Sequence, residues 1–584
     1  MILVPALASL FERFFVDDQP PALEEQGHNG PVLLWQRGAR EQRCVPTNDR
    51  FGGQHFGRAQ ARESAAVVAQ YGQQPILVGA AERFPNQADE FFAVSGVGHL
   101  GHPARAHSYL HKFRQFGFLD NWVRLIGGRF LTRVKPQPIN SGVMSMKGQG
   151  RRDYPLPPPL EPRLQRRYQK LVQEHLQISQ SVAAGLSSLP GVASSFASTQ
   201  AAWRFYRNEH VSLPALAQPL IEQGRRALRG SGAEYGLVIH DWSHLNYDRH
   251  TRKADRIDSA KDRRQGYELQ SALLLSDRQG EPLAPIYQNL RCSAGLHSTR
   301  CEPTVPTVTH LDELGARFEH LEQLALGRPL VHLVDREGDS VGHFRQWERH
   351  RFLVRAKGGQ RVEWDGRTCL LSAVADQMKR QLVYCRPAEW HGRSAKQYVG
   401  ETSVVLTRRT RQKRRGAKPV SVAGKPVRLR LIVSEVRAEH GRVLAQWLLL
   451  TNVSAEVEAA RLALWYYWRW RIESFFKLLK SAGQQIEHWQ QESGLQVARR
   501  LLVVSGALVL VWQLARAQGT AAGQLRTILV RLSGRQMRWG REWTTPALLA
   551  GVWGLLAMLE LLEHYDLSQL RQLARTFFNP DEQR

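Results

Sequence analysis

The chain has 584 residues, 42% of them hydrophobic, and carries 80 Lys and Arg against 53 Asp and Glu, a formal net charge of +27. This length and apolar content exclude a disordered tail protein and a disulfide-stapled miniprotein, and they predict three or four domains. The positive charge favours a polyanionic partner, nucleic acid before a membrane surface, over a basic surface that binds nothing.

Cysteines and apolar runs indicate the compartment. The five cysteines are scattered and form no Cys-x-x-Cys pair, so we expect neither a disulfide framework nor structural zinc, and a reducing, cytoplasmic setting fits. The apolar runs Leu501–Leu514 and Ala547–Leu559 are shorter than the ~20 residues of a membrane span and are predicted to be buried helices. The cysteines are Cys44, Cys292, Cys301, Cys369 and Cys385.

The first 143 residues differ from the rest of the chain. They carry a net charge of only +3, which leaves +24 for residues 144–584, and their periodicity is weak. We leave 1–143 unassigned, as either a fused segment or an upstream start-site misreading, with the working protein beginning near Met144 or Met146. Residues 144–163 are predicted to be a proline-rich linker.

Residues 164–233 are predicted to form a helical DNA-binding domain. Within it, Ser and Thr cap signals precede a run in which aromatic residues alternate with basic ones. Such a helix could grip DNA by stacking and by phosphate contact, or could be an amphipathic core helix with a basic outer face. The DNA-contacting candidates are Trp203, Arg204, Arg207 and Asn208.

From residue 234 the pattern changes to strands. The apolar runs 236–240 and 329–334 end directly at Asp241 and Asp335, and two further strands around 267–293 read as a hairpin. Strand ends open onto the rim of an α/β sheet, where ligands and metals bind. Taken alone, each aspartate is better explained as a turn or helix-cap residue.

Alternating segments between 360 and 455 predict a β-rich insertion that holds a basic loop at 408–418, and residues from about 456 to 481 are predicted to be helical. At 3.6 residues per turn, Tyr466, Arg469, Glu473 and Lys480 fall within about 60° of one another on that helix. An apolar stripe beside them can pack on the sheet. The alternative is a solvated charged face.

The spacing Tyr466-x2-Arg469-x3-Glu473-x6-Lys480 resembles the signature of bacterial DDE transposases of the insertion-sequence-four group, which includes the transposase of the kanamycin-resistance composite transposon. The likeness extends to AAWRFYRN (201–208), IHDWSHLNY (239–247), VDREGDS (334–340), RFLVRAK (351–357) and WLLLTN (447–452), and spans about 160–520. Residues 1–143 have no counterpart, and the final helices match only loosely.

The resemblance implies an α/β, RNase H-like catalytic core, a mixed sheet flanked by helices, formed by residues 234–359 and 456–490 around the insertion at 360–455. It implies a catalytic triad of Asp241, Asp335 and Glu473 that holds two Mg²⁺ ions, with Mn²⁺ as a substitute. The implied reaction is cut-and-paste transposition: nicking at inverted repeats, a hairpin intermediate and strand transfer.

The resemblance also assigns roles around the triad. Tyr466, Arg469 and Lys480 are expected to contact phosphates, and Arg355 end DNA. Trp447 is expected to stack on a flipped base, against the alternative of β-core packing. The helical region 491–584 is expected to dimerise, giving a homodimer that synapses double-stranded DNA ends in the bacterial cytoplasm, at the nucleoid.

Two other readings stay open. An RNase H-like endonuclease would cut DNA without strand transfer. A decayed copy would act only as a DNA-binding regulator, although all three acids are present.

Overall fold

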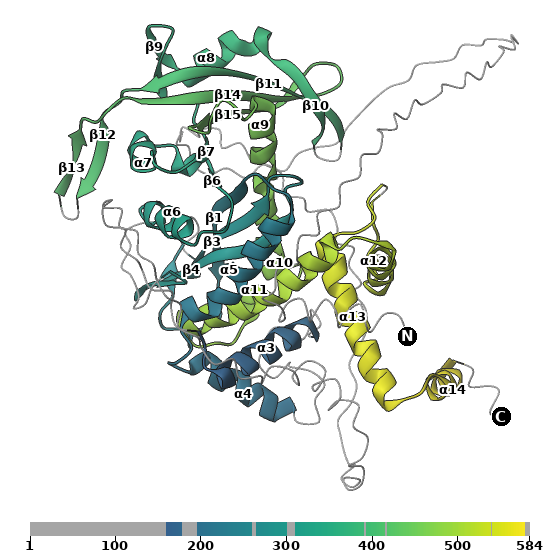
Figure 1. The fold of residues 1–584 in the computed structure, drawn as a ribbon. Coiled ribbons are helices and arrows are strands. Elements are labelled where there is room, and N and C mark those ends of the chain that lie inside the picture. The colour runs from purple at the N-terminus through teal and green to yellow at the C-terminus, as the bar shows by residue number, and fades with distance from the viewer. Residues whose placement is uncertain are drawn as a thin grey trace, which may run out of the picture. The chain divides into compact units, whose positions relative to one another are not determined.

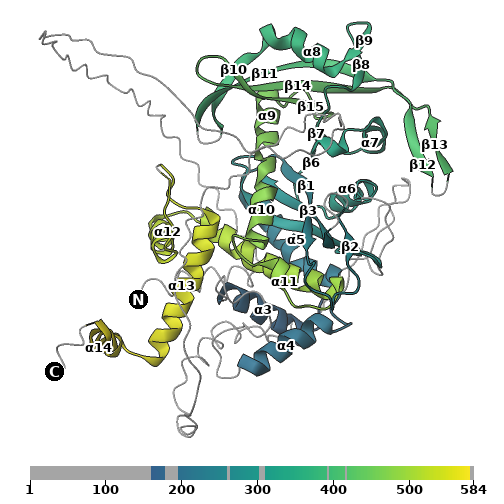
Figure 2. The same cartoon turned by 180° about the vertical axis from the view of Figure 1, so that it is seen from behind.

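The computed structural model describes residues 159–177, 195–259, 264–300, 310–390, 393–414, 417–538 and 540–578. These residues belong to one compact unit (Figures 1 and 2). The predictions for residues 1–143, and for linker residues 144–158, lie outside the described residues.

Thirteen strands form a single mixed sheet in the described part of the chain, with the order β5-β4-β3-β1-β6-β7-β15-β14-β11-β8-β9; β2 joins β3, and β10 joins β11. The strands are β1 (Gly236–Asn246), β2 (Ile257–Asp258), β3 (Gln265–Ser276), β4 (Pro282–Cys292), β5 (Gly295–Ser298), β6 (Leu330–Val334), β7 (Phe352–Arg355), β8 (Arg361–Trp364), β9 (Arg367–Leu370), β10 (Val383–Trp390), β11 (Arg393–Leu406), β14 (Val427–Arg437) and β15 (Val443–Thr451).

The centre of the sheet combines hairpins with crossovers. β3 pairs antiparallel with β1 and β4, as the predicted hairpin requires, whereas β6 lies parallel to β1 and β7 parallel to β6. The parallel pairs are possible because α6 (Leu314–Gln323) and α7 (Val341–Gln346) carry the chain back between strands. The mixed sheet flanked by helices is confirmed and is consistent with an RNase H-like transposase domain.

Helices cover both faces of this sheet (Figures 1 and 2). The larger apolar core includes α5 (Leu213–Gly230), α10 (Arg471–Leu479) and α11 (Gly494–Arg516). A second core includes side chains of α6 and α7 together with α8 (Leu371–Met378). A side chain on a central strand therefore points into one of two distinct environments.

The helix predicted from about 456 to 481 is interrupted. α9 (Ala459–Tyr467) is followed by a 3₁₀ turn at Trp468–Trp470, then α10, and Lys480 lies just beyond the end of α10. The single helical arc assumed for Tyr466 to Lys480 is therefore wrong in detail, because tightening to 3₁₀ changes the rotation per residue.

The C-terminal region is helical, with α11 followed by α12 (Thr520–Leu532), α13 (Thr545–His564) and α14 (Leu567–Phe578). α11 is long and apolar enough to cross a membrane by length and composition, but 89% of its most apolar window is buried inside the protein. This confirms the run Leu501–Leu514 as a buried helix. α13 is buried at Leu548 and Leu555 but exposes Met558 near its end.

The N-terminal helices α3 (Pro162–Gln177) and α4 (Ser195–Arg207) pack near α11. The buried Arg499 of α11 donates hydrogen bonds to the carbonyl oxygens of Val211 and Tyr206. α3 begins at Pro162, inside the predicted linker, because proline is compatible with the first turn of a helix.

The predicted basic loop 408–418 is mostly a two-stranded antiparallel ribbon, β12 (Thr410–Arg414) with β13 (Ala417–Val422). Figure 1 shows the ribbon projecting at the margin of the large sheet. The ribbon follows β11 and precedes β14, two long strands that pair with each other.

Gly266 controls the pairing of β1 with β3. A Cβ added to Gly266 would lie 1.8 Å from the carbonyl oxygen of Leu245, a backbone atom that cannot move independently. We expect Gly266→Ala to lower the free energy of unfolding by about 3 kcal/mol, because overpacking against backbone forces the strands apart. Gly359→Ala is the control, since its Cβ meets nothing within 4 Å. Equal denaturation midpoints for the two variants would contradict this expectation.

Candidate active site and nucleic-acid interface

Asp241 and Asp335 lie at the same level on neighbouring strands. β1 pairs with β6 through Ile239 and Leu333, and each aspartate is two residues further along its own strand direction. Since side chains two apart share a face, both aspartates project from the same face of the sheet. Asp335 follows the last residue of β6, as predicted, and its side chain accepts a hydrogen bond from the backbone N–H of Glu337.

Asp241 does not end its strand, contrary to the sequence-based expectation. β1 continues to Asn246, and Asp241 pairs with Ser271 of β3. The pairing with β6 stops at Ile239, so the opposite edge of β1 is unpaired at Asp241. The edge of the sheet at which the aspartates lie is therefore formed where β6 ends while β1 continues.

Glu473 of α10 is linked to Asp241 through Arg469. The Arg469 guanidinium donates to Asp241 Oδ2 and to Glu473 Oε1, both at 2.8 Å. The spacing of four residues between Arg469 and Glu473 survives the 3₁₀ interruption, so the two side chains still meet. One cation thus joins β1 to α10 at the predicted triad.

The carboxylates are electrostatically coupled. Burial raises the pKa of Asp241 to about 6, although Arg469 acts to lower it, and the charges of Asp335 and Glu473 add to the increase. Burial also raises the pKa of Glu473, against the lowering effect of Arg469. These mutual effects are expected of carboxylates that share one site. Such perturbed groups are common where function resides.

Tyr466 and Arg355 belong to the same group. Tyr466 is 3% exposed, and burial raises its pKa to about 12. Burial lowers the pKa of Arg355, which lies close enough to Tyr466, Arg469 and Asp335 to interact electrostatically with each. Both residues were singled out from sequence, and the structure brings both to the acids.

Lys480 is held beside the end of β1. Its Nζ donates to the carbonyl oxygen of His244 at 2.6 Å and lies 3.3 Å from Glu487 Oε1. Glu487 Oε1 also accepts from the backbone N–H of Asn246. Lys480 is thus a neighbour of the strand that carries Asp241, in contact with backbone as well as with an acid.

Trp447 lies in β15 opposite Ser434 and is 5% exposed. Its ring centroid is 6.2 Å from that of Trp390. This burial favours the β-core packing that the sequence left open, and base stacking by Trp447 stays a prediction that needs the side chain to become accessible.

The basic residues of α4 face outward. Trp203, Arg204 and Arg207 are exposed, whereas Phe205 and Tyr206 are buried, so α4 has a core side and a basic side. The Arg207 guanidinium lies 4.3 Å from the Trp203 ring centroid, and Asn208 accepts from the backbone N–H of His210. This surface offers a stacking ring and cations for a DNA backbone.

The triad suits a hard cation. Asp241, Asp335 and Glu473 contribute only carboxylate oxygens, the donors that Mg²⁺ and Mn²⁺ prefer. Their coupled negative charges have Arg469 as a counter-charge here. In the part of the chain that the structure describes, the groups with three ligand atoms within 4.8 Å of one another are both outside the triad: Asp255, Cys292 and His297, and Glu322, His332 and His350.

Sequence reasoning missed an acidic and aromatic neighbour of the triad. Trp242, next to Asp241, stacks on His310 with ring centroids 4.0 Å apart. His310 Nε2 lies 3.1 Å from Glu337 Oε2, and His310 Nδ1 lies 3.5 Å from Glu268 Oε2. Glu337 lies within the quoted motif 334–340, but only the fold shows that it meets His310.

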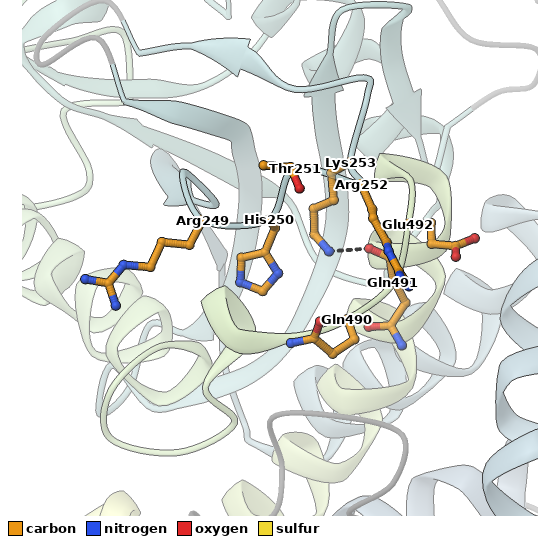
Figure 3. A pocket seen from close by; sticks show the side chains of 8 residues that line it. All are labelled: Arg249, His250, Thr251, Arg252, Lys253, Gln490, Gln491 and Glu492. Atoms are coloured by element: carbon orange, nitrogen blue, oxygen red, sulfur yellow. Dashed lines mark hydrogen bonds between the residues drawn. The ribbon is translucent and has the colours of Figure 1, made fainter.

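A pocket of ≈ 460 Å³ lies on other residues. It is lined by 249–253 and 490–492, and Figure 3 shows Lys253 extending across to Gln491. Lys253 Nζ donates to the carbonyl oxygens of Trp489 and Gln491, so this lysine ties two chain segments together. Burial lowers the pKa of Lys253 to about 8. None of the three acids lines this pocket.

Comparison with known proteins agrees with this geometry. Residues 232–510 match the family model described as the transposase DDE domain. The matched range contains β1, β6 and α10, and so all three acids. No curated protein matches the chain. Residues 232–510 are therefore similar to the transposase DDE domain.

Proposed function

We propose that the protein is a cut-and-paste transposase of the insertion-sequence-four group that acts on the inverted repeats at its element's ends. The observation that carries the proposal is the convergence of Asp241, Asp335 and Glu473 within a transposase DDE domain. Transposases act on DNA, and the net charge of +27 suits that substrate.

The three carboxylates would hold two Mg²⁺ ions, with Mn²⁺ as a substitute. When bound, such ions activate a nucleophilic oxygen and stabilise the leaving oxygen of a phosphodiester in an in-line displacement. Hydrolysis of a phosphodiester at the element's end would free a 3′-OH. Attack of that hydroxyl on the phosphodiester of the opposite strand would close a hairpin and release the flanking DNA with a 3′-OH. Hydrolysis of the hairpin would restore the element's 3′-OH, which would then attack a target phosphodiester and expel the target's 3′ oxygen. Each step is a phosphoryl transfer with a different nucleophile, so one site serves all.

The other side chains of the site supply charge and position. Arg469 and Arg355 lie beside the acids and would neutralise the phosphate that enters between them. Tyr466 and Lys480 would hold the strand that is not transferred. The basic face of α4 and the ribbon β12–β13 would bind end DNA through its backbone, with strong dependence on salt.

Synapsis requires two chains, and we propose a homodimer formed through residues 491–584. Support comes from α13 and the segment after it, where Met558, Leu561, Leu562 and Leu567 are all at least 40% exposed. Exposed apolar residues gathered on one helical segment indicate an interaction surface.

The test incubates the purified full chain with Mg²⁺ and DNA that carries the repeats flanking its own gene. Products separate on a denaturing gel. We expect cleavage at the repeat ends, hairpins, and joined products with a target plasmid. Binding without cleavage would favour the decayed regulator, and cutting unrelated to the ends would favour the endonuclease.

The raised pKa of Asp241 predicts competition between protons and Mg²⁺. Only the deprotonated carboxylate binds a metal ion. In the metal-free protein the Asp241 side chain has a pKa of about 6, so it is mostly protonated below about pH 6. The Mg²⁺ concentration for half-maximal cleavage should therefore rise about tenfold per pH unit below about pH 6 and stay level above about pH 7. Cleavage rates over a Mg²⁺ titration at each pH measure this. An unchanged midpoint down to about pH 5 would contradict the assignment of Asp241 as a metal ligand.

A further inference from the structure

A second group of metal-binding side chains lies on the sheet face opposite the triad. His332 is in the middle of β6, between Val331 and Leu333, so its side chain points away from the face of Asp335. Glu322 is near the end of α6, and His350 lies two residues before β7. The three residues therefore come from three separate elements and meet beneath the strands.

Their spacing suits a tetrahedral ion. One ligand atom from each of Glu322, His332 and His350 lies within 4.8 Å of the others, and His332 Nε2 is 3.5 Å from Glu322 Oε1. Ligand atoms on a tetrahedral Zn²⁺ with bonds of about 2.0–2.1 Å are about 3.3–3.4 Å apart. A small contraction around an ion would bring the group to that separation.

His332 directs one ring nitrogen toward Glu322. The His332 side chain is fully buried, and the acceptor nearest to its Nε2 is Glu322 Oε1 at 3.5 Å, longer than an ordinary hydrogen bond. Its Nδ1 lies 2.9 Å from His240 Nε2, and Phe318 stacks flat on the ring at 3.9 Å. A second hydrogen-bonding partner and a packed ring are the usual means of orienting a metal-binding histidine.

We propose that Glu322, His332 and His350 bind a structural Zn²⁺ ion. The fourth position is taken by Glu319, whose Oε2 lies 3.5 Å from His350 Nε2, or by water. Imidazole and carboxylate together favour Zn²⁺ over Mg²⁺, which prefers oxygen alone. No sequence motif indicates such a site, because the cysteines form no zinc-binding pair.

The other candidate group is already satisfied by hydrogen bonds. Asp255 accepts from Tyr267 Oη at 2.5 Å and from the backbone N–H of Gly494 at 2.8 Å. Cys292 Sγ lies 3.5 Å from His297 Nε2. The Asp255 carboxylate therefore has short hydrogen bonds without an ion, whereas the acceptor nearest to His332 Nε2 is 3.5 Å away.

The ion would stabilise the positions of β6 and β7 relative to α6. It would tie α6 to β6 and β7, and β6 leads directly to Asp335. This role is separate from the reaction, since the proposed zinc ligands and the triad are on opposite faces. Zinc binding at this site is therefore expected whether or not the protein catalyses transposition.

The test measures zinc in the purified full chain by mass spectrometry after loading with Zn²⁺ and exhaustive gel filtration. We expect about one ion per chain in the unaltered protein, and a Tm about 5 °C above that of the chelator-treated protein. His350→Ala should lose one equivalent of zinc, whereas His350→Cys should keep it, because a thiolate also binds zinc.

Three variants separate this site from others. His440→Ala removes an exposed histidine in the β14–β15 turn and should keep the zinc, as should Asp335→Asn at the triad. Cys292→Ser should keep it too; loss there instead would overturn the assignment. If His350→Ala does not fold, the isosteric Glu322→Gln replaces it. Equal zinc in the unaltered chain and in these ligand variants would also overturn the proposal.

Discussion

Asp335→Asn is expected to reduce DNA cleavage at the element's ends by about a thousandfold or more. The change replaces a carboxylate oxygen with an amide and removes one charge from the coupled acids, while the side-chain shape is kept. Metal-assisted charge stabilisation supplies several kcal/mol to such displacements, and about 4 kcal/mol corresponds to a thousandfold in rate. Single-turnover cleavage at fixed Mg²⁺ measures the loss.

The matched control is Asp365→Asn. Asp365 is an exposed residue of the β8–β9 turn with φ +48°, a conformation that asparagine adopts as readily as aspartate. It should keep full cleavage. DNA binding by Asp335→Asn should persist, because phosphate contacts come from elsewhere. A variant with Asp335→Asn that still cleaves within tenfold of the unaltered protein would remove Asp335 from the triad.

The local setting of two of the three acids, Asp335 and Glu473, was predictable from sequence pattern, whereas their assignment to a triad came from the family resemblance and stays a prediction. Asp335 follows an unbroken apolar run, which the structure shows as the buried strand β6. Glu473 sits four residues after Arg469, a spacing that brings side chains together on a helix. Local pattern therefore placed Asp335 and Glu473 in their elements, whereas the predicted strand end at Asp241 was wrong because β1 continues to Asn246.

Contacts between distant segments could not be predicted in the same way. Pairing of β15 with β7 joins residues about 100 apart in the chain, and it places the region 360–455 in the same sheet as the core. The alternation of apolar and polar residues in β15 does not determine which face of the strand packs on the core. The burial of Trp447 could therefore not be predicted from sequence. His332 gave only one weak signal, a single polar residue in an apolar strand.

The 3₁₀ interruption at Trp468–Trp470 had no local signal either. The segment contains no glycine or proline, so its propensity does not mark a break. Gly280, with φ +65°, lies against the ring of Trp468, where an added Cβ would come within 2.1 Å. The helix is thus interrupted where Trp468 packs against a residue distant in the chain. Sequence periodicity carries no information about such a contact.

Arg469→Gln is expected to destabilise the metal-free protein and to make it more responsive to Mg²⁺. The variant leaves the mostly buried Asp241 carboxylate without its cation, which for a buried pair costs about 3 kcal/mol in the free energy of unfolding at neutral pH. The pKa of Asp241 should rise further, since Arg469 now acts to lower it. Added Mg²⁺ should recover more stability in Arg469→Gln than in the unaltered protein, because the ion supplies the missing positive charge.

Arg461→Gln provides the comparison, because Arg461 bridges two acids in the same manner away from the triad. Its guanidinium lies 2.7 Å from Glu234 Oε2 and 2.5 Å from Asp277 Oδ2. Thermal unfolding with and without Mg²⁺ should show both variants destabilised and only Arg469→Gln recovered. Equal recovery would mean that Mg²⁺ stabilises the protein generally and that Arg469 does not stand where cations bind. Recovery confined to Arg469→Gln would instead place the Mg²⁺ charge at the acids that Arg469 neutralises, which is what a metal-binding triad requires.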